Sequence, residues 1–339
     1  MRRPRSGLAI GLGAVGLSTL AYPGLIAWAR RALVADAPLE ELESALDGWL
    51  AEARLVASHR YFHTPVGRVH ALLAGGGGRT LVVLPGLQAS AGDMARLLAQ
   101  LARDYRVVAI DRPGCGLSDP LRSPSQPWST WDQVISAVTG ELSLDGFDLV
   151  GHSLGGLAAG RFAVAHPDQV GQLVLISPLG LGRRIPLSWN LALVPGVMDL
   201  MALRERRDLV RQVPGPSLAE GMGKRSSAAA PSPWELYRSA VGLRFGAHSD
   251  LSSVGRVFRP LGLPPESRLL PALGLLSGRV LVLWGSDDRR LPLSSAKAEL
   301  DYYPGLRLDV IEGAGHLLPF DQPQMTAQLV ATWMKSADF

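Results

Sequence analysis

The feature that most constrains the fold is a regular alternation of short apolar runs with helix-length segments. Strands whose residues are apolar throughout are expected where both faces of a sheet are covered. Repeated strand-helix units of this kind predict an α/β fold, with a mostly parallel sheet and helices on both faces. The expected strands are 80–84, 106–110, 147–151 and 172–176, and the expected helices are about 91–103, 130–142 and 154–165.

The alternation stops after residue 180 and returns near residue 278. Strands are expected again at 279–284 and 307–311, and a final helix from Pro323 to Met334. We therefore expect one core built from 60–180 and 278–339. The block 181–277, which is rich in leucine and proline, is predicted to be a mainly helical insertion between two strands of the sheet.

A connector is expected before this core, over residues 31–59. Leucines and a tryptophan at nearly helical spacing predict an amphipathic helix from Pro38 to Ser58. Extended runs follow at 60–64 and 68–73. The glycine run 75–78 precedes a strand instead of joining a strand to a helix, so it indicates a turn and not a phosphate-binding loop.

Residues 1–30 are predicted to direct the chain to a membrane. No charged residue occurs between Ser6 and Ala29, and arginines flank this stretch on both sides. As a helix, the stretch is long enough to cross the ~30 Å core of a bilayer. It also fits a secretory signal peptide, with Gly7 to Leu20 as its apolar part and a cleavage site at 27–29. We expect an uncleaved membrane anchor. The alternative is a secreted or periplasmic protein.

The composition argues against several classes of function. The net charge is only +4 and no DNA- or RNA-binding motif occurs, so no nucleic-acid partner is expected. The single cysteine, Cys115, excludes an intramolecular disulfide and a cysteine-rich metal site. The seven histidines are not spaced as metal ligands.

Ser153 is the candidate nucleophile. It stands in Gly151-His152-Ser153-Leu154-Gly155, which fits the pattern G-x-S-x-G and lies between an expected strand and an expected helix. In that setting the glycines permit a tight turn that lifts the serine above the edge of the sheet, at the positive end of the helix. His152 is expected to help shape this turn.

A serine hydroxyl needs a base, and the base needs an acid that orients it. His316 is the best-placed histidine, because it follows the last strand and precedes the final helix. Asp287 and Asp288 both follow the strand 279–284. We prefer Asp288 as the acid and expect Asp287 to cap the turn. Asp287 is the alternative candidate for the acid.

Acyl transfer also needs two hydrogen-bond donors for the oxyanion that forms. The backbone N–H of Leu154, next to the nucleophile, is one candidate. The second is the N–H of Leu87 in the loop Pro85-Gly86-Leu87-Gln88, because Pro85 has no N–H and Gly86 lets a ligand approach closely.

These motifs resemble the α/β-hydrolase superfamily, in its serine-nucleophile branch of esterases and lipases. The order Ser153, Asp288, His316 is the order of that family, and 111–119 resembles its D-x-P-G-x-G-x-S turn, in which Asp111 has a structural role. A serine at position 153 argues against dehalogenases and epoxide hydrolases. Pro85 departs from the His-Gly that many members have at the oxyanion loop.

The resemblance implies an α/β-hydrolase fold in which 181–277 is a cap over the active site. The cap is basic and apolar, with a cluster at Arg204, Arg206, Arg207 and Arg211, which suits a membrane surface and acyl-chain substrates. An ordinary solvated helix face explains it equally well.

We therefore expect a hydrolase that cleaves a carboxylic ester, with a small molecule or a lipid such as an acylglycerol as substrate, and needs neither cofactor nor metal. The alternatives are an amide, lactone or C–C bond hydrolase with the same triad, and a non-catalytic accessory protein.

Overall fold

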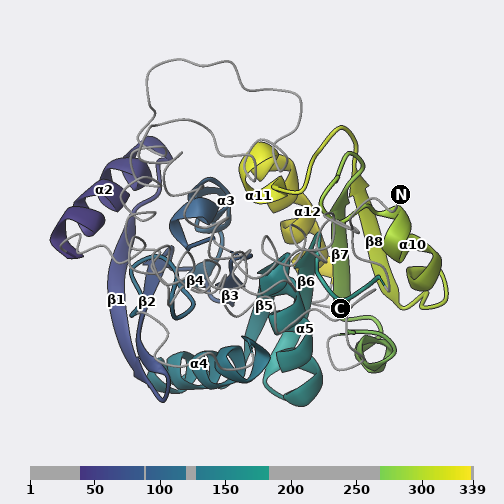
Figure 1. Ribbon diagram of the computed structural model, residues 1–339, viewed down its shortest axis with the longest axis horizontal. Coiled ribbons are helices and arrows are strands. Elements are labelled where there is room, and N and C mark those ends of the chain that lie inside the picture. Colours follow the sequence, from purple (N-terminus) through teal and green to yellow (C-terminus); the bar gives the residue numbers. More distant parts are fainter. Residues whose placement is uncertain (1–38, 88, 120–126, 183–267, 337–339) are drawn as a thin grey trace, which may run out of the picture.

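The structure is a computed structural model that describes residues 39–87, 89–119, 127–182 and 268–336. The predicted membrane segment and most of the predicted cap lie outside these ranges. Eight strands form one sheet in the order β1-β2-β4-β3-β5-β6-β7-β8 (Figure 1). Their bounds are β1 Ala57–Thr64, β2 Gly67–Ala74, β3 Thr80–Leu84, β4 Arg106–Ile110, β5 Phe147–His152, β6 Val170–Ile176, β7 Val280–Gly285 and β8 Leu306–Ile311.

The sheet is mostly parallel, as the alternation predicts. β1 and β2 form an antiparallel hairpin, and β2 pairs antiparallel with β4. Every other pair of neighbours, from β4 and β3 across to β7 and β8, is parallel. The carboxyl ends of the parallel strands therefore meet at one edge of the sheet, where an open α/β sheet usually binds its ligands.

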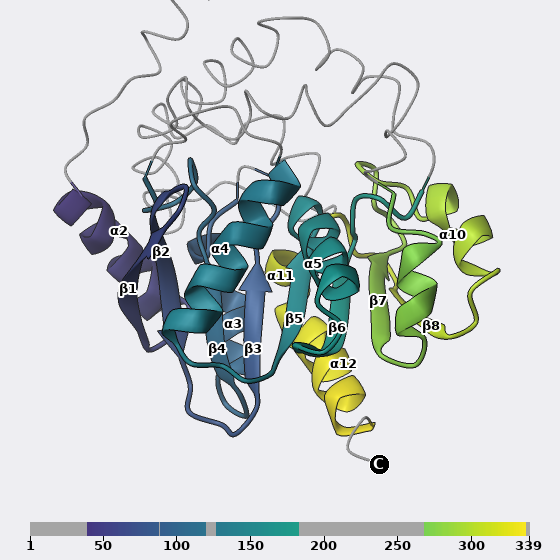
Figure 2. The ribbon, with the colours of Figure 1, turned by 90° about the horizontal axis from the view of Figure 1, so that it is seen from below.

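Helices cover both faces of this sheet (Figures 1 and 2). Leu81 and Val83 of β3 pack on one face with α2, α3, α11 and α12, and Val82 and Leu84 pack on the other with α4, α5 and α10. The alternation of side chains along a strand thus divides one apolar run between two cores. The helices are α2 Leu39–Glu52, α3 Ala95–Leu101, α4 Pro127–Glu141, α5 Leu154–Ala165, α10 Ser294–Leu300, α11 Leu318–Asp321 and α12 Pro323–Ser336, and the 3-10 turns are η1 Gly92–Met94 and η4 Ala272–Leu276.

The first described helix is shorter than the sequence predicts. A helix was expected through Ser58, but α2 ends at Glu52 and β1 already begins at Ala57. Arg54 adopts a left-handed conformation (φ 57°), and the N–H of Leu55 donates to the carbonyl of Leu50 at 2.9 Å. This pattern ends the helix. The apolar periodicity that predicts the helix does not show where the helix ends.

The last residues of the predicted cap belong to the packed core. Leu269, Leu273 and Leu276 are buried against the α5 side of the sheet. A side chain at Gly160 of α5 would approach Leu269 to 2.8 Å, so the glycine lets this segment pack closely. Within residues 39–87, 89–119, 127–182 and 268–336, no helix is both long enough and apolar enough to cross a membrane.

Candidate active site

Ser153 lies in a sharp turn between β5 and α5. Its backbone has φ 52° and ψ −115°, a region that non-glycine residues rarely adopt. The surrounding chain holds it there, because its N–H donates to the carbonyl of Ile176 at 2.9 Å and its carbonyl accepts from the N–H of Leu179, also at 2.9 Å. The turn raises the hydroxyl above the carboxyl edge of the sheet.

Glycines make this turn sterically possible. A Cβ at Gly151 would lie 2.5 Å from the carbonyl oxygen of Gly155, and a Cβ at Gly155 would overlap the carbonyl oxygen of Leu84. Both contacts are with backbone atoms, which cannot move aside as a flexible side chain can. The two glycines of the motif therefore allow α5 to start directly against β3 and β5.

The structure brings Ser153 together with His316 and Asp288. Nε2 of His316 lies 3.0 Å from Oγ of Ser153, and Nδ1 of His316 lies 2.8 Å from Oδ2 of Asp288. All three residues are buried, with 7%, 2% and 4% of the residue surface exposed respectively. The candidate nucleophile, base and acid are thus in hydrogen-bonding contact at one edge of the sheet.

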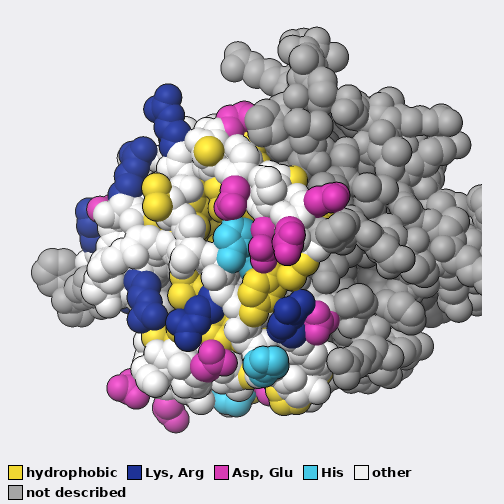
Figure 3. Space-filling model, turned by 90° about the vertical axis from the view of Figure 1, so that its left-hand side faces the viewer, with side chains coloured by type: hydrophobic (Ala, Val, Ile, Leu, Met, Phe, Trp, Pro, Cys, Tyr) yellow, Lys and Arg dark blue, Asp and Glu magenta, His cyan; other side chains and the backbone are white. Residues whose placement is uncertain are grey.

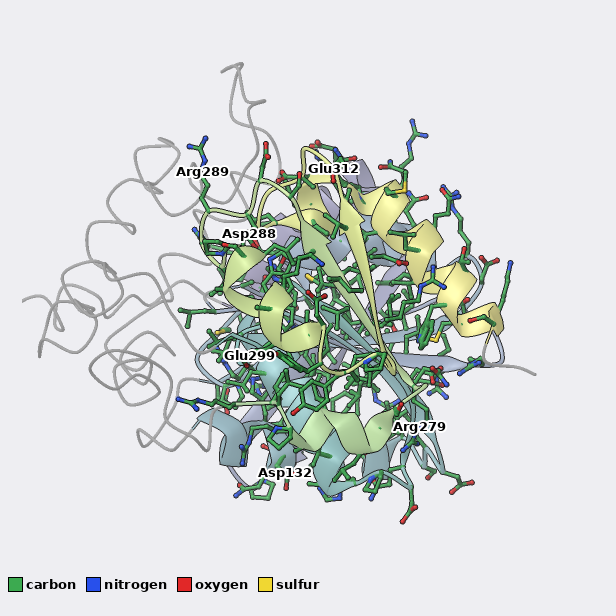
Figure 4. The ribbon with its side chains drawn as sticks, turned by 90° about the vertical axis from the view of Figure 1, so that its right-hand side faces the viewer. Asp132, Arg279, Asp288, Arg289, Glu299 and Glu312 are labelled. Atoms are coloured by element: carbon green, nitrogen blue, oxygen red, sulfur yellow. The ribbon has the colours of Figure 1, made fainter. Side chains whose placement is uncertain are left out.

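Asp288, and not Asp287, contacts the imidazole. Figure 4 shows Asp288 turned into the body of the protein, whereas its neighbour Arg289 projects outward. Asp287 is exposed, and its N–H donates to the carbonyl of Ala314 at 2.9 Å, which ties the loop after β7 to the loop after β8. The backbone of Asp287 thereby helps to hold the two loops together.

The carboxylate of Asp288 is fixed on both oxygens. Oδ1 accepts the N–H groups of Arg290 at 2.9 Å and Leu291 at 2.8 Å, which leaves Oδ2 for His316. An ionised carboxylate can only accept hydrogen bonds, so Nδ1 of His316 carries the hydrogen and Nε2 offers a lone pair to the hydroxyl of Ser153. This is the tautomer that a general base requires.

His152 braces His316, the candidate base. Its Nε2–H donates to the carbonyl of His316 at 2.9 Å, and the two ring centroids lie 5.0 Å apart. Burial, with a smaller effect from neighbouring His316, lowers the pKa of His152 to about 3, so the ring is neutral at physiological pH. The sequence analysis predicts only that His152 shapes the turn, because nothing in the motif reveals the contact with His316.

The two predicted oxyanion donors flank the nucleophile. Leu154 is the first residue of α5, so its N–H has no acceptor within that helix. Leu87 follows Gly86, at which an added Cβ would lie 3.1 Å from Cβ of Ser153 and 3.0 Å from Nδ1 of His152. Gly86 therefore packs directly against the nucleophile, and the Leu87 N–H lies one residue further along the same loop.

The turn after β4 has the structural role expected of it. Asp111 is buried and accepts the N–H groups of Ala91 at 2.6 Å and Leu117 at 3.0 Å, and Nδ1 of His70 lies 2.7 Å from its Oδ2. A Cβ at Gly116 would overlap the carboxylate. Among the residues that the structure describes, no group of three or more His, Cys, Asp or Glu side chains could hold a metal ion.

Comparison with known proteins identifies the family of this chain. The model of the alpha/beta hydrolase family matches residues 81–329, which is most of the chain. The chain belongs to the alpha/beta hydrolase family. The matched range contains β4 to β8 of the sheet together with Ser153, Asp288 and His316.

Proteins similar to this chain carry the names of different hydrolases. A 2-hydroxy-6-oxononadienedioate/2-hydroxy-6-oxononatrienedioate hydrolase of Cupriavidus pinatubonensis is 24% identical over 273 residues, 79% of this chain and 90% of that protein. Among solved structures, a carboxylesterase of Bacillus subtilis has a TM-score of 0.66 at 21% identity, covering 87% of this chain and 98% of its own. A membrane phospholipase A has a TM-score of 0.65 at 23% identity, covering 97% and 99%. The two structures show the shared fold.

Proposed function

We propose that this alpha/beta hydrolase cleaves carboxylic esters through an acyl-enzyme on Ser153. The observation that carries the proposal is the continuous contact from Oγ of Ser153 through His316 to Asp288, at 3.0 and 2.8 Å. A buried serine with a correctly oriented base beside it and backbone N–H groups on both sides is suited to attack a carbonyl carbon.

The first half of the reaction forms the acyl-enzyme. Oγ of Ser153 bonds to the ester carbonyl carbon while Nε2 of His316 takes the hydroxyl proton. The carbonyl oxygen becomes an oxyanion that accepts the N–H groups of Leu87 and Leu154. When the tetrahedral intermediate collapses, the C–O bond to the alcohol breaks, and the imidazolium gives its proton to the departing oxygen.

The second half releases the acid. Water takes the place of the alcohol, Nε2 of His316 removes a proton from it, and the hydroxide oxygen bonds to the acyl carbon. Collapse of this second intermediate breaks the bond to Oγ, which regains its proton from His316. Asp288 stays ionised and balances the charge of the imidazolium in both halves.

A lipid ester such as an acylglycerol is the proposed substrate class. The basic, leucine-rich cap predicted over 181–277 and the apolar segment of residues 1–30 support it, since both suit a substrate that partitions into a membrane. We also propose that residues 1–30 attach the enzyme to a membrane. To test this, cells that express the full chain and cells that express residues 31–339 are fractionated. If both proteins have the same share in the soluble fraction, the proposal is contradicted.

A series of p-nitrophenyl esters of increasing acyl length tests the activity. Wild-type protein should hydrolyse them, with kcat/KM rising with chain length if the substrate is a lipid, and Ser153→Ala should lose at least about 10⁴-fold. A fluorophosphonate probe should label Ser153 and no other serine. Equal turnover by both proteins refutes the mechanism, and absence of labelling indicates an accessory protein that keeps only the fold.

Hydrolysis of a C–C bond is the second candidate, because the relative in Cupriavidus pinatubonensis is named for a substrate of that kind. The same triad can serve it, since the difference lies in the group that leaves. Product analysis with 2-hydroxy-6-oxononadienedioate separates the two activities. If the compound is split into two products at a C–C bond and no ester is turned over, the second candidate is favoured.

A further inference from the structure

A cavity lies on the outer side of the helices α2, α3 and α12, and its lining contains no residue of the triad. It has a volume of about 830 Å³ and is bounded by the end of α2, the exposed side of α3 and the start of α12. Three arginines line it, Arg54, Arg96 and Arg103, together with the carboxylate of Glu52. None of the residues that form the candidate active site lines this cavity.

Arg96 lies over two aromatic rings in the wall of this cavity. Its guanidinium carbon lies 5.3 Å from the ring centroid of Trp49 and 4.6 Å from that of Phe320, and the two rings are stacked on each other. Nη2 of Arg96 also forms a long ion pair with Oε1 of Glu52, at 4.0 Å. The aromatic rings attract the cation but carry no negative charge that would neutralise it.

Arg54 occupies a position where glycine is normally preferred. It directly follows the last turn of α2 with φ 57°, a conformation that is unfavourable for any residue with a Cβ. Strain of this kind persists where the surrounding structure imposes it, often at functional positions. Here the side chain that the strained position carries is a cation that borders the cavity.

The charges around the cavity are unbalanced. Within the described ranges, the side chains of Arg54 and Arg103 form no ion pair or hydrogen bond. Glu52 is the single carboxylate in the lining. Figure 3, which faces the α2 side of the molecule, shows Lys and Arg side chains along its left and Asp and Glu side chains nearer its centre. The cavity therefore has an excess of positive charge that an anion would balance.

The shape and chemistry of the lining narrow the class of ligand. Guanidinium groups match the oxygens of a phosphate in a forked, two-bond geometry. Apolar side chains share the lining with them, and one of these, Val56, is 90% exposed although it is a large hydrophobic residue. We propose that this cavity binds a phosphate ester, either the headgroup of an anionic phospholipid or a soluble phosphate, through Arg54, Arg96 and Arg103.

The test measures binding without turnover, so it is independent of the proposed activity. Full-length Ser153→Ala protein is mixed with phosphatidylcholine vesicles that contain or lack phosphatidylglycerol, and separately titrated with glycerol 3-phosphate and inorganic phosphate. In this background, Arg54→Gly and Arg103→Gln are made singly and together. The control, Arg60→Gln with Arg307→Gln, removes the same number of positive charges from β1 and β8.

Each arginine near a membrane surface should contribute about fivefold to binding, so the double variant should bind anionic vesicles about 25-fold more weakly than the control. Arg54→Gly should melt at or above the temperature of its parent, because glycine relieves the strained backbone, so weaker binding cannot result from unfolding.

The ligands then identify the source of the phosphate. If the double variant binds only the vesicles more weakly than the control, the ligand is a lipid headgroup. If it binds glycerol 3-phosphate or phosphate more weakly, and this binding saturates, the ligand is soluble. The proposal is overturned if the double variant and the control bind every ligand equally well, or if no phosphate compound binds.

Discussion

Asp288→Asn should abolish activity by turning the amide of the new side chain the wrong way. The backbone N–H groups of Arg290 and Leu291 point at the position of Oδ1, at 2.9 and 2.8 Å. Both N–H groups donate and need an oxygen as acceptor there, so the NH2 group must face Nδ1 of His316. The imidazole then has to accept at Nδ1 and carry its hydrogen on Nε2, where it can no longer take the proton of Ser153.

The expected loss in kcat is about 10⁴-fold, equivalent to about 5 kcal/mol of transition-state stabilisation. Stability should change far less, because both backbone donors keep an oxygen acceptor. Asp288→Ala removes that acceptor and leaves two N–H groups unsatisfied in a mostly buried loop, at about 1–3 kcal/mol each. The two variants should therefore be similarly inactive but differ in stability.

Steady-state hydrolysis of a p-nitrophenyl ester, together with thermal melting, checks both halves of this prediction. Asp287→Asn is the matched control, since Asp287 is exposed and contributes to the loop through its backbone. It should retain activity within a few-fold of wild type. If Asp288→Asn is folded and retains more than about a tenth of wild-type kcat, the tautomer argument is wrong.

Three further predictions concern the frame of the site. Because the pKa of buried His152 is about 3 against 6.5 in the unfolded chain, the unfolded chain binds more protons between these values, and the free energy of unfolding should fall as pH drops through this window. The slope should reach about 1.4 kcal/mol per pH unit at most, and melting of His152→Gln should lack this component. Gly155→Ala should lower the yield of folded protein sharply, since its Cβ would overlap the Leu84 carbonyl, whereas Gly140→Ala, with no atom within 4 Å, should stabilise α4 by about 0.5–1 kcal/mol. Asp111→Ala should destabilise the protein by about 3–5 kcal/mol, measured by denaturant unfolding, and leave kcat of the folded fraction nearly unchanged.

The sheet could be predicted from the sequence because its signal is local. Runs such as Leu81 to Leu84 are apolar at every position, which indicates burial on both faces, and the helices between them carry their own periodicity. The order of the strands in the sheet could not be predicted from these local signals. β4 lies between β2 and β3, although it follows both of them along the chain, and that arrangement depends on long-range packing.

Residues of the site could be predicted where a local sequence pattern singles out one residue of the required type. The glycine pattern around Ser153 and the position of His316 after the last strand identify candidates, and the structure places their side chains in contact. Their catalytic roles stay predictions. The brace from His152 and the two N–H groups on Asp288 could not be foreseen, since neither depends on a local pattern in the sequence.

The distance along the chain between nucleophile and base has a consequence for biosynthesis. Ser153 and His316 are 163 residues apart, and their loops meet only after β7 and β8 have been added to the sheet. A nascent chain on the ribosome that has exposed Ser153 but not yet β8 holds an unassisted hydroxyl, which is a weak nucleophile. The proposed hydrolysis therefore requires β8 and the loop that follows it, and truncated translation products that end before β8 should be inactive.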